Sequence, residues 1–457
     1  MGKDDFPKKR PKWGSSTVSD KGNGRNRRQY KGMGLKKVGI GTIFEFAQTK
    51  IGVPMPTYLY YTQGISDFQE ETATYSEERL EIHLKRKKHR CPKCKSKDVT
   101  LTVLYERDVR GLPMGRLREV HFIYALHQVY CHRCHERSIE DIPFISHPKA
   151  RLSNEFERTI LELREQISIR ALANYFRLRW HTVKEIEKRY LQHKFATIDT
   201  SKVKAVGVDE IHIGHGQANR GFLTIVRDLE SGAVIHVGNG KGVSALEGAL
   251  SKLSASKLQL VAMDMANAYS TWFAEHFPKA QIVFDHFHVI KLMNDRLDHV
   301  RRRVMGRLDS IQQKQLKGLR FIFLKNNEDI PENARNILRN LRGNFQELGD
   351  TYMFKEALRT IYRVVQNAYQ ANIALHRWCK LAEETLVPEL KTMAKTIRDR
   401  LDGIVSYWAF GHASNASTEG FNNKIRWLIR QAYGFRDLEY FKLKIYQLPE
   451  INCEKAL

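Results

Sequence analysis

The sequence lacks any long hydrophobic run. No continuous apolar stretch approaches the roughly 20 residues that a helix needs to cross a bilayer. The N-terminus carries charged residues with no apolar segment behind them, so it does not resemble a cleavable secretory signal. We therefore expect a soluble protein of the cytoplasm that has no membrane partner.

Cysteine is scarce, and its spacing is informative. Four of the six cysteines form two C-x-x-C pairs, Cys91/Cys94 and Cys131/Cys134, in a lysine-rich setting. In a cytosolic protein such pairs favour metal over disulfide. The alternating stretches 99–106 and 120–130 suit strands, so residues 81–140 predict a zinc ribbon in which four thiolates hold a structural Zn²⁺.

The zinc ribbon is not the only interpretation of these cysteines. The 36 residues between the two pairs exceed the usual spacing, although an inserted hairpin would leave the knuckles intact. The alternatives are four unrelated reduced cysteines, or a site in which His89 or His135 replaces one thiolate.

Acidic residues are outnumbered by basic ones. The chain has 76 Lys and Arg against 51 Asp and Glu, a formal charge of +25, which is far more than solubility needs. Double-stranded DNA is the leading candidate for a polyanionic partner. At 457 residues the chain is also too long for one compact core, so several domains are expected.

The first 80 residues carry no recognisable motif. Residues 1–36 are rich in Lys, Arg, Gly and Ser with almost no periodic apolar residues, which predicts a flexible basic tail. Residues 37–80 contain apolar stretches whose role the sequence does not indicate.

Residues 150–195 show two apolar patterns at helical spacing, followed by a third over 181–190. This order predicts a helix-turn-helix whose last helix enters the major groove of DNA. Its basic residues Lys184, Lys188 and Arg189 are expected to be exposed and to contact phosphates. A generic helical hairpin is the alternative.

From residue 200 to 457 strand and helix patterns alternate. Strands are expected over 203–208, 222–226, 233–237, 258–263 and 281–284, and helices over 243–253 and 269–277. A long helical stretch, about 300–405, is expected as an insertion before the last part of this domain. The fold class is thus multidomain α/β, with an all-α insertion in the C-terminal domain.

Two carboxylates end apolar strands, Asp209 the first and Asp264 the fourth. Carboxylates that lie close together repel unless a cation sits between them, so this pair predicts Mg²⁺ or Mn²⁺. A third ligand, Glu419, heads a helix pattern whose polar face carries further candidate DNA contacts: Asn423, Lys424, Arg426 and Arg430.

Other carboxylates compete for the second position. Asp285 also ends a strand, but that strand would be the fifth, at the sheet edge and farther from Asp209. Strand alternation points Glu210 away from Asp209, and Glu275 belongs to a helix. We expect both glutamates to lie on solvated faces.

These motifs resemble the ISL-three (ISL3) family of bacterial insertion-sequence transposases. The similar segments are 209–212 (DEIH), 263–269 (MDMANAY), 277–292 and 419–425 (EGFNNKI), and the match extends from about residue 85 to 446. The resemblance implies an RNase H-like DDE catalytic domain, with Asp209, Asp264 and Glu419 as its acids. It also implies that Asp285 and His288 are an accessory pair.

The expected function is that of a DNA transposase. Such an enzyme binds the ends of its insertion sequence, cleaves DNA with metal-activated water and transfers the freed 3′ hydroxyl to a target. Pairing two ends implies a homodimer or larger synaptic assembly, associated with the bacterial nucleoid. The alternatives are a DNA-binding regulator or inactive relic, and a junction-resolving nuclease that cuts without joining.

Overall fold

The structure of the protein is a computed structural model that describes residues 58–214, 221–316, 320–332, 345–412, 416–432 and 434–449. The predicted tail over 1–36 lies outside these residues, as do residues 37–57. The chain divides into two compact units, Met1–Ser66 and Asp67–Leu457, and the described part of the first contains helix α1 (Tyr58–Gln63). Among the described helices, none is long and apolar enough to cross a bilayer.

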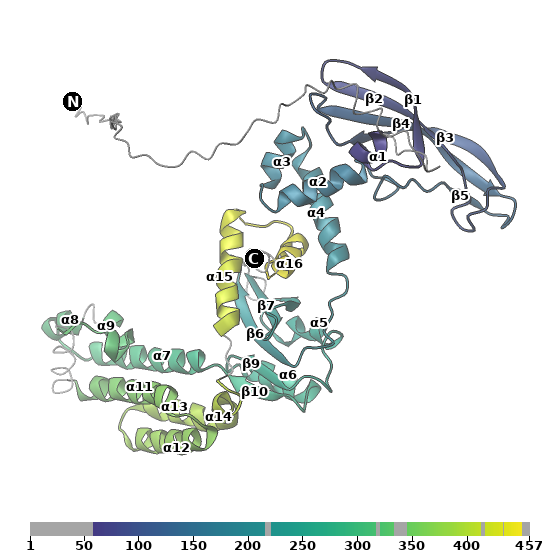
Figure 1. Ribbon diagram of the computed structural model, residues 1–457. Helices are drawn as coiled ribbons and strands as arrows, with labels where there is room; N and C mark the ends of the chain where they lie inside the picture. Colours follow the sequence, from purple (N-terminus) through teal and green to yellow (C-terminus); the bar gives the residue numbers. More distant parts are fainter. Residues whose placement is uncertain are drawn as a thin grey trace, which may run out of the picture. The chain divides into compact units, whose positions relative to one another are not determined.

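The second unit begins with a five-stranded sheet (Figure 1). Its strands are β1 (Phe68–Tyr75), β2 (Arg79–Arg86), β3 (Val99–Gly111), β4 (Glu119–Cys131) and β5 (Arg137–Ile139). The order is β1-β2-β4-β3, β5 pairs with β4, and only the β2–β4 pair is parallel. Alternate residues of β4 are buried, as expected for a strand with one covered face. Strands β3 and β4 confirm the two strands predicted between the cysteine pairs.

Three helices follow: α2 (Asn154–Arg164), α3 (Ile169–Tyr175) and α4 (Trp180–Lys194). Two of them begin at a serine. The hydroxyl of Ser153 accepts from the backbone N–H of Phe156, and that of Ser168 from Ala171, so each satisfies an otherwise free helical donor. Their apolar faces share one core that includes Phe156, Ile160, Leu172, Val183 and Ile186.

A second sheet forms the centre of the C-terminal part. Its strands are β6 (Ala205–His212), β7 (Phe222–Asp228), β8 (Val234–Asn239), β9 (Leu260–Met263) and β10 (Gln281–Phe284), with α6 (Asn267–His276) between the last two. The order is β10-β9-β6-β7-β8. The first and fourth strands, β6 and β9, are therefore parallel neighbours, and β10 lies at the edge, as expected.

Most predicted elements of this domain are shifted by one or two residues at an end, and two differ more from the expected bounds. Strand β6 does not end before Asp209 but continues to His212, because β7 pairs with it over that length. Residues 243–253 do not form one helix: a 3₁₀ turn, η4 (Val243–Ala245), precedes the short α5 (Glu247–Leu250). The carbonyl of Ala245 accepts a hydrogen bond from His236 at 2.9 Å, a side-chain contact that a periodicity of apolar residues does not reveal.

The long helical region starts earlier than residue 300. Helix α7 (His286–Met305) begins directly after β10, because the carboxylate of Asp285 accepts from the backbone N–H of Phe287 and caps it. The following elements are α8 (Ser310–Leu316), α9 (Arg320–Leu324), η5 (Asn327–Asp329), α11 (Gln346–Val364), α12 (Ala368–Glu384), α13 (Pro388–Asp399) and α14 (Leu401–Ala409). Helices α7, α11, α12 and α13 pack as a bundle (Figure 1).

The two faces of the second sheet have separate cores. Val206, Val208 and Val226 share one core with α6 and α7. On the other face, Ile211 and Ile225 pack against α15 (Ala416–Gln431) and α16 (Leu438–Gln447). Helix α15, which carries Glu419, is thus fixed against the strand that carries Asp209.

Candidate active site

The carboxylate of Asp209 lies half-buried in the middle of the second sheet. Its Oδ2 accepts a hydrogen bond from Nδ2 of Asn422 on α15, at 2.7 Å. Burial raises the pKa of the Asp209 carboxyl to about 6, and the nearby carboxylate of Asp264 acts in the same direction. A buried carboxylate with such a neighbour is more stable as an anion when a cation is present.

Asp264 lies level with Asp209 on the neighbouring strand. Strands β6 and β9 run parallel, and their last aligned pair is Gly207 with Ala262. Asp209 follows two residues later within β6 and Asp264 two residues later, directly after the end of β9, so the two are brought to a similar height of the sheet. The backbone N–H of Ala266 donates to Oδ1 of Asp264 at 3.0 Å and fixes the orientation of that carboxylate.

Glu419 lies exposed in the first turn of α15. It precedes Asn422 by three residues, a rise of about 4.5 Å on the same helical face. Arg227 of β7 holds this end of the helix, since its Nη1 donates to the carbonyl of Ser417 at 2.8 Å and its guanidinium lies 4.1 Å from the ring centroid of Phe421. In the described part of the chain, the three acids do not form a group with ligand atoms within 4.8 Å of one another.

The predicted accessory pair is divided between two roles. Asp285 is buried, caps α7 and lies 3.3 Å from Nδ1 of His286. His288 faces Asp209 closely enough to oppose the rise in its pKa. His288 and Asp264 also line the same cavity, which has a volume of about 410 Å³.

Glu210 is not on a solvated face, contrary to our expectation. It points away from Asp209 into a half-buried position, where its Oε1 accepts from the hydroxyl of Tyr269 at 2.6 Å. That hydroxyl also lies 3.0 Å from Oγ1 of Thr224. Strand alternation gives the direction of Glu210 but does not reveal that α6 covers this face. Glu275, in contrast, is exposed as predicted.

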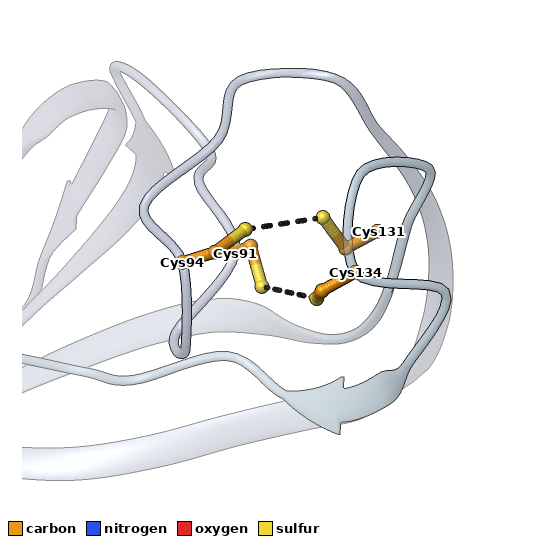
Figure 2. Close-up of side chains that lie close together, drawn as sticks. All are labelled: Cys91, Cys94, Cys131 and Cys134. Carbon is orange, nitrogen blue, oxygen red and sulfur yellow. Dashed lines mark hydrogen bonds between the residues drawn. The ribbon is translucent and has the colours of Figure 1, made fainter.

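The four cysteines of the C-x-x-C pairs converge in the first sheet's domain (Figure 2). Their sulfurs are 3.7 Å apart between Cys91 and Cys134, and 3.5 Å apart between Cys94 and Cys131. A tetrahedral site with metal–sulfur bonds of about 2.3 Å has edges of about 3.8 Å, so the arrangement fits Zn²⁺. The backbone N–H of Cys94 helps to lower the pKa of the Cys91 thiol to about 6, whereas burial and the neighbouring thiols raise the pKa of Cys134 to about 12, so protons are held unequally among the four sulfurs.

His89 does not replace one of the four cysteines, because it belongs to a different cluster. It lies with His127 around the buried carboxylate of Glu140, which also accepts from Nη1 of Arg86 at 3.0 Å. The Arg86 guanidinium supplies a positive charge to the Glu140 carboxylate, so this carboxylate is paired without a metal, while Nδ1 of His89 and Nε of Arg86 lack a hydrogen-bond partner among the described residues.

Most of this chain is similar in sequence to known proteins. The model of the family of ISL3 transposases of the DDE type, which is described as "Transposase", matches residues 206–445. This match covers more than half of the chain. The chain belongs to the ISL3 family of transposases.

Two relatives that are named insertion-sequence transposases agree with this assignment. The transposase for insertion sequence element IS1001 of Bordetella parapertussis is 29% identical over 364 residues, which are 78% of this chain and 87% of that protein. The transposase for IS1557 of Mycobacterium tuberculosis (strain H37Rv) is 26% identical over 332 residues, 66% of this chain and 72% of that protein.

Of the three basic residues of α4 that were predicted to be exposed in the transposase, Lys184 and Lys188 are not, whereas the side chain of Arg189 is 41% exposed. The side chains of Lys184 and Lys188 are 14% and 15% exposed, and both donate to the carboxylate of Asp437, at 2.8 and 3.1 Å. Nη2 of Arg189 donates to Glu157 at 2.6 Å. These partners lie on α2 and at the start of α16, outside the local pattern from which exposure was predicted.

The polar face of α15 is as open as the sequence suggests. The residues on it that we predicted to contact DNA are all exposed: Asn423, Lys424, Arg426 and Arg430. Nη1 of Arg426 donates to Oδ1 of Asn423 at 2.7 Å. The helical pattern places Asn422 on this polar face together with Glu419 and Asn423, but nothing in it indicates that Asn422 contacts Asp209.

Proposed function

We propose that the transposase cleaves the ends of its insertion sequence and joins the freed 3′ hydroxyl to target DNA. Asp209, Asp264 and Glu419 are the proposed catalytic ligands of Mg²⁺ or Mn²⁺. The observation that carries the proposal is the placement of Asp209 on β6 and of Asp264 directly after β9, its parallel neighbour, where the Asp264 carboxylate acts on the pKa of Asp209. Glu419, one helical turn from a residue bonded to Asp209, is within reach of the same site.

The residues at this site fit a divalent cation. Two hard oxygen ligands lie on adjacent strands, and burial raises the pKa of Asp209, a condition that a bound cation relieves. When bound, such ions activate water and stabilise charge on the phosphate during in-line displacement. Asn422 holds the Asp209 carboxylate, and His288 faces it from α7.

The four cysteines are the proposed ligands of a structural Zn²⁺. Support comes from sulfur separations of 3.5 and 3.7 Å, which match the edges of a tetrahedral thiolate site. A site closed by four protein ligands stabilises its domain and leaves no position for a substrate.

Double-stranded DNA is the proposed partner, in the form of element ends and target. The charge of +25 supports it, as does the exposed basic face of α15. Helices α2, α3 and α4 are the proposed helix-turn-helix. Because transposition joins two element ends, we also propose a homodimer or larger assembly that pairs them and is associated with the nucleoid.

The test is incubation of the purified protein and Mg²⁺ with labelled DNA that carries the ends of its element, and with a plasmid target. Wild type should give cleaved and joined products, and Asp264→Asn should bind DNA without giving either. Glu275→Gln is the matched control, because this exposed carboxylate lies on α6, after Asp264. Binding without products in the wild type would favour a regulator, and cleavage without joining would favour a nuclease.

A further inference from the structure

The cavity beside Asp264 is formed by three separate elements. One face of α7 lines it with His288, Lys291, Leu292 and Arg296, the loop after β9 adds Met265, and Arg400 follows α13. Its volume of about 410 Å³ falls in the range of roughly 300–1,000 Å³ that is usual for small-molecule sites. The cavity is therefore large enough for one building block of a polymer.

Two arginines of this cavity have unsatisfied donors. The Nε atoms of Arg296 and Arg400 are both buried and have no hydrogen-bond partner among the residues that the structure describes. Nη2 of Arg400 donates to Oδ1 of Asn267 at 2.5 Å, which fixes the position of that guanidinium. A buried donor without a partner destabilises a protein, so two of them at one cavity favour a ligand that accepts hydrogen bonds.

The charges of the lining favour an anion. Three cationic side chains, Lys291, Arg296 and Arg400, face two carboxylates, Asp264 and Asp295. Asp264 is a proposed ligand of the catalytic cation, which leaves Asp295 as the carboxylate that opposes the three cations. A planar guanidinium can bind a phosphate through two parallel hydrogen bonds, which suits the geometry of a phosphodiester.

Met265, Ala266 and Leu292 add apolar side chains to the lining, and Thr396 adds a hydroxyl. An occupant with one anionic group, polar edges and a flat face that packs on apolar side chains suits this mixed lining, and a nucleotide of the DNA strand has this composition. We propose that this cavity is a subsite for the nucleotide next to the cleaved bond, with its phosphate bound by Arg296 and Arg400. The inference rests on the proposed function, because Asp264 places the cavity beside the reacting phosphate.

The experiment measures binding of element-end DNA to the full chain in the presence of Ca²⁺, with one phosphate at a time replaced by an uncharged methylphosphonate. For wild type, one replacement next to the cleavage site should weaken binding at least about tenfold. Arg296→Ala should bind the unmodified DNA more weakly than wild type does. It should lose less affinity than wild type on that replacement, because only Arg400 still contacts the phosphate, and its salt dependence should be lower by about one phosphate contact. Lys391→Ala removes an exposed cation from α13 and should behave as wild type.

Equal sensitivity of Arg296→Ala and wild type to every replacement would overturn the subsite. If Arg296→Ala has a lowered melting temperature, Arg400→Gln is measured against the same set of replacements and decides the question. The outcomes are separate from those of the proposed function. If wild type gives cleaved and joined DNA but the effect of the phosphate replacement on binding does not depend on either arginine, only the subsite is excluded. If that effect depends on the arginines but no cleaved or joined DNA forms, only the catalytic proposal is excluded.

Discussion

At the residue scale, the chemistry of Asp209 depends on a neighbour 213 positions later in the sequence. The Asn422 amide donates to its carboxylate and so selects one orientation of a half-buried ligand. Groups that orient a metal ligand without binding the metal contribute to affinity and rate. Asn422 is therefore a positioning residue in this account.

Replacing Asn422 by Ala should lower the rate of DNA cleavage by roughly 10- to 100-fold. The Mg²⁺ concentration for half-maximal rate should rise, because the carboxylate is no longer held. Cleavage rates across a Mg²⁺ titration measure both effects. Gln431→Ala, an exposed change on the same helix, should leave them as in wild type, and an unchanged Mg²⁺ dependence in Asn422→Ala would contradict the role.

His236 should make stability depend on pH. Burial lowers its pKa from 6.5 to about 4. The unfolded chain therefore takes up a proton near pH 6.5 while the folded chain does not, so this contribution is present above pH 6.5 and is lost as the pH falls towards 4. The urea midpoint should drop between pH 7 and pH 5 in wild type and drop less in His236→Gln. Equal drops in the two proteins would exclude His236 as a source.

Sequence patterns predicted single residues well where chemistry requires a fixed spacing. The four cysteines converge as their spacing indicates. The exposure of Lys184 and Lys188 was wrong, because their partner Asp437 comes from a helix about 250 residues away. Periodicity describes which face of one element is apolar, but the partner of a charged side chain depends on tertiary packing.

At the element scale, the bounds of the strands were predicted more closely than those of the helix between β8 and β9. Each strand of the second sheet is a run of apolar residues bounded by polar ones, and this signal is local. The break between η4 and α5 depends on the close approach of β8, where a Cβ on Gly238 would lie 1.9 Å from the carbonyl oxygen of Ala245. Such a contact is not encoded in the apolar spacing of residues 243–253.

Gly238→Ala should therefore destabilise the fold by about 1–3 kcal/mol, because the neighbouring atom belongs to the backbone and cannot rotate away. Gly242→Ala is the matched control, since an added Cβ there meets nothing within 4 Å and the backbone is extended. Urea unfolding measures both. A Gly238→Ala protein as stable as Gly242→Ala would show that the approach of β8 to η4 relaxes without cost.

At the scale of the whole molecule, the proposed zinc should be needed for the first sheet's domain and not for the core of the helical bundle. Atomic absorption should find about one zinc per chain, and Cys94→Ser should lose it and unfold this domain at a lower temperature. Cys379→Ala removes a buried thiol of α12 and should retain the metal. Full zinc content in Cys94→Ser would contradict the four-cysteine site.

The central claim is that acids from two adjacent strands and from a separate helix act at one catalytic site. The most direct measurement is the cleavage rate of Glu419→Gln, since this acid comes from the distant element. DNA binding should be retained in this variant, and cleavage should fall by more than the roughly 10- to 100-fold typical of a supporting residue. Glu275→Gln should cleave at the wild-type rate. Cleavage by Glu419→Gln at the wild-type rate would exclude Glu419 as the third acid.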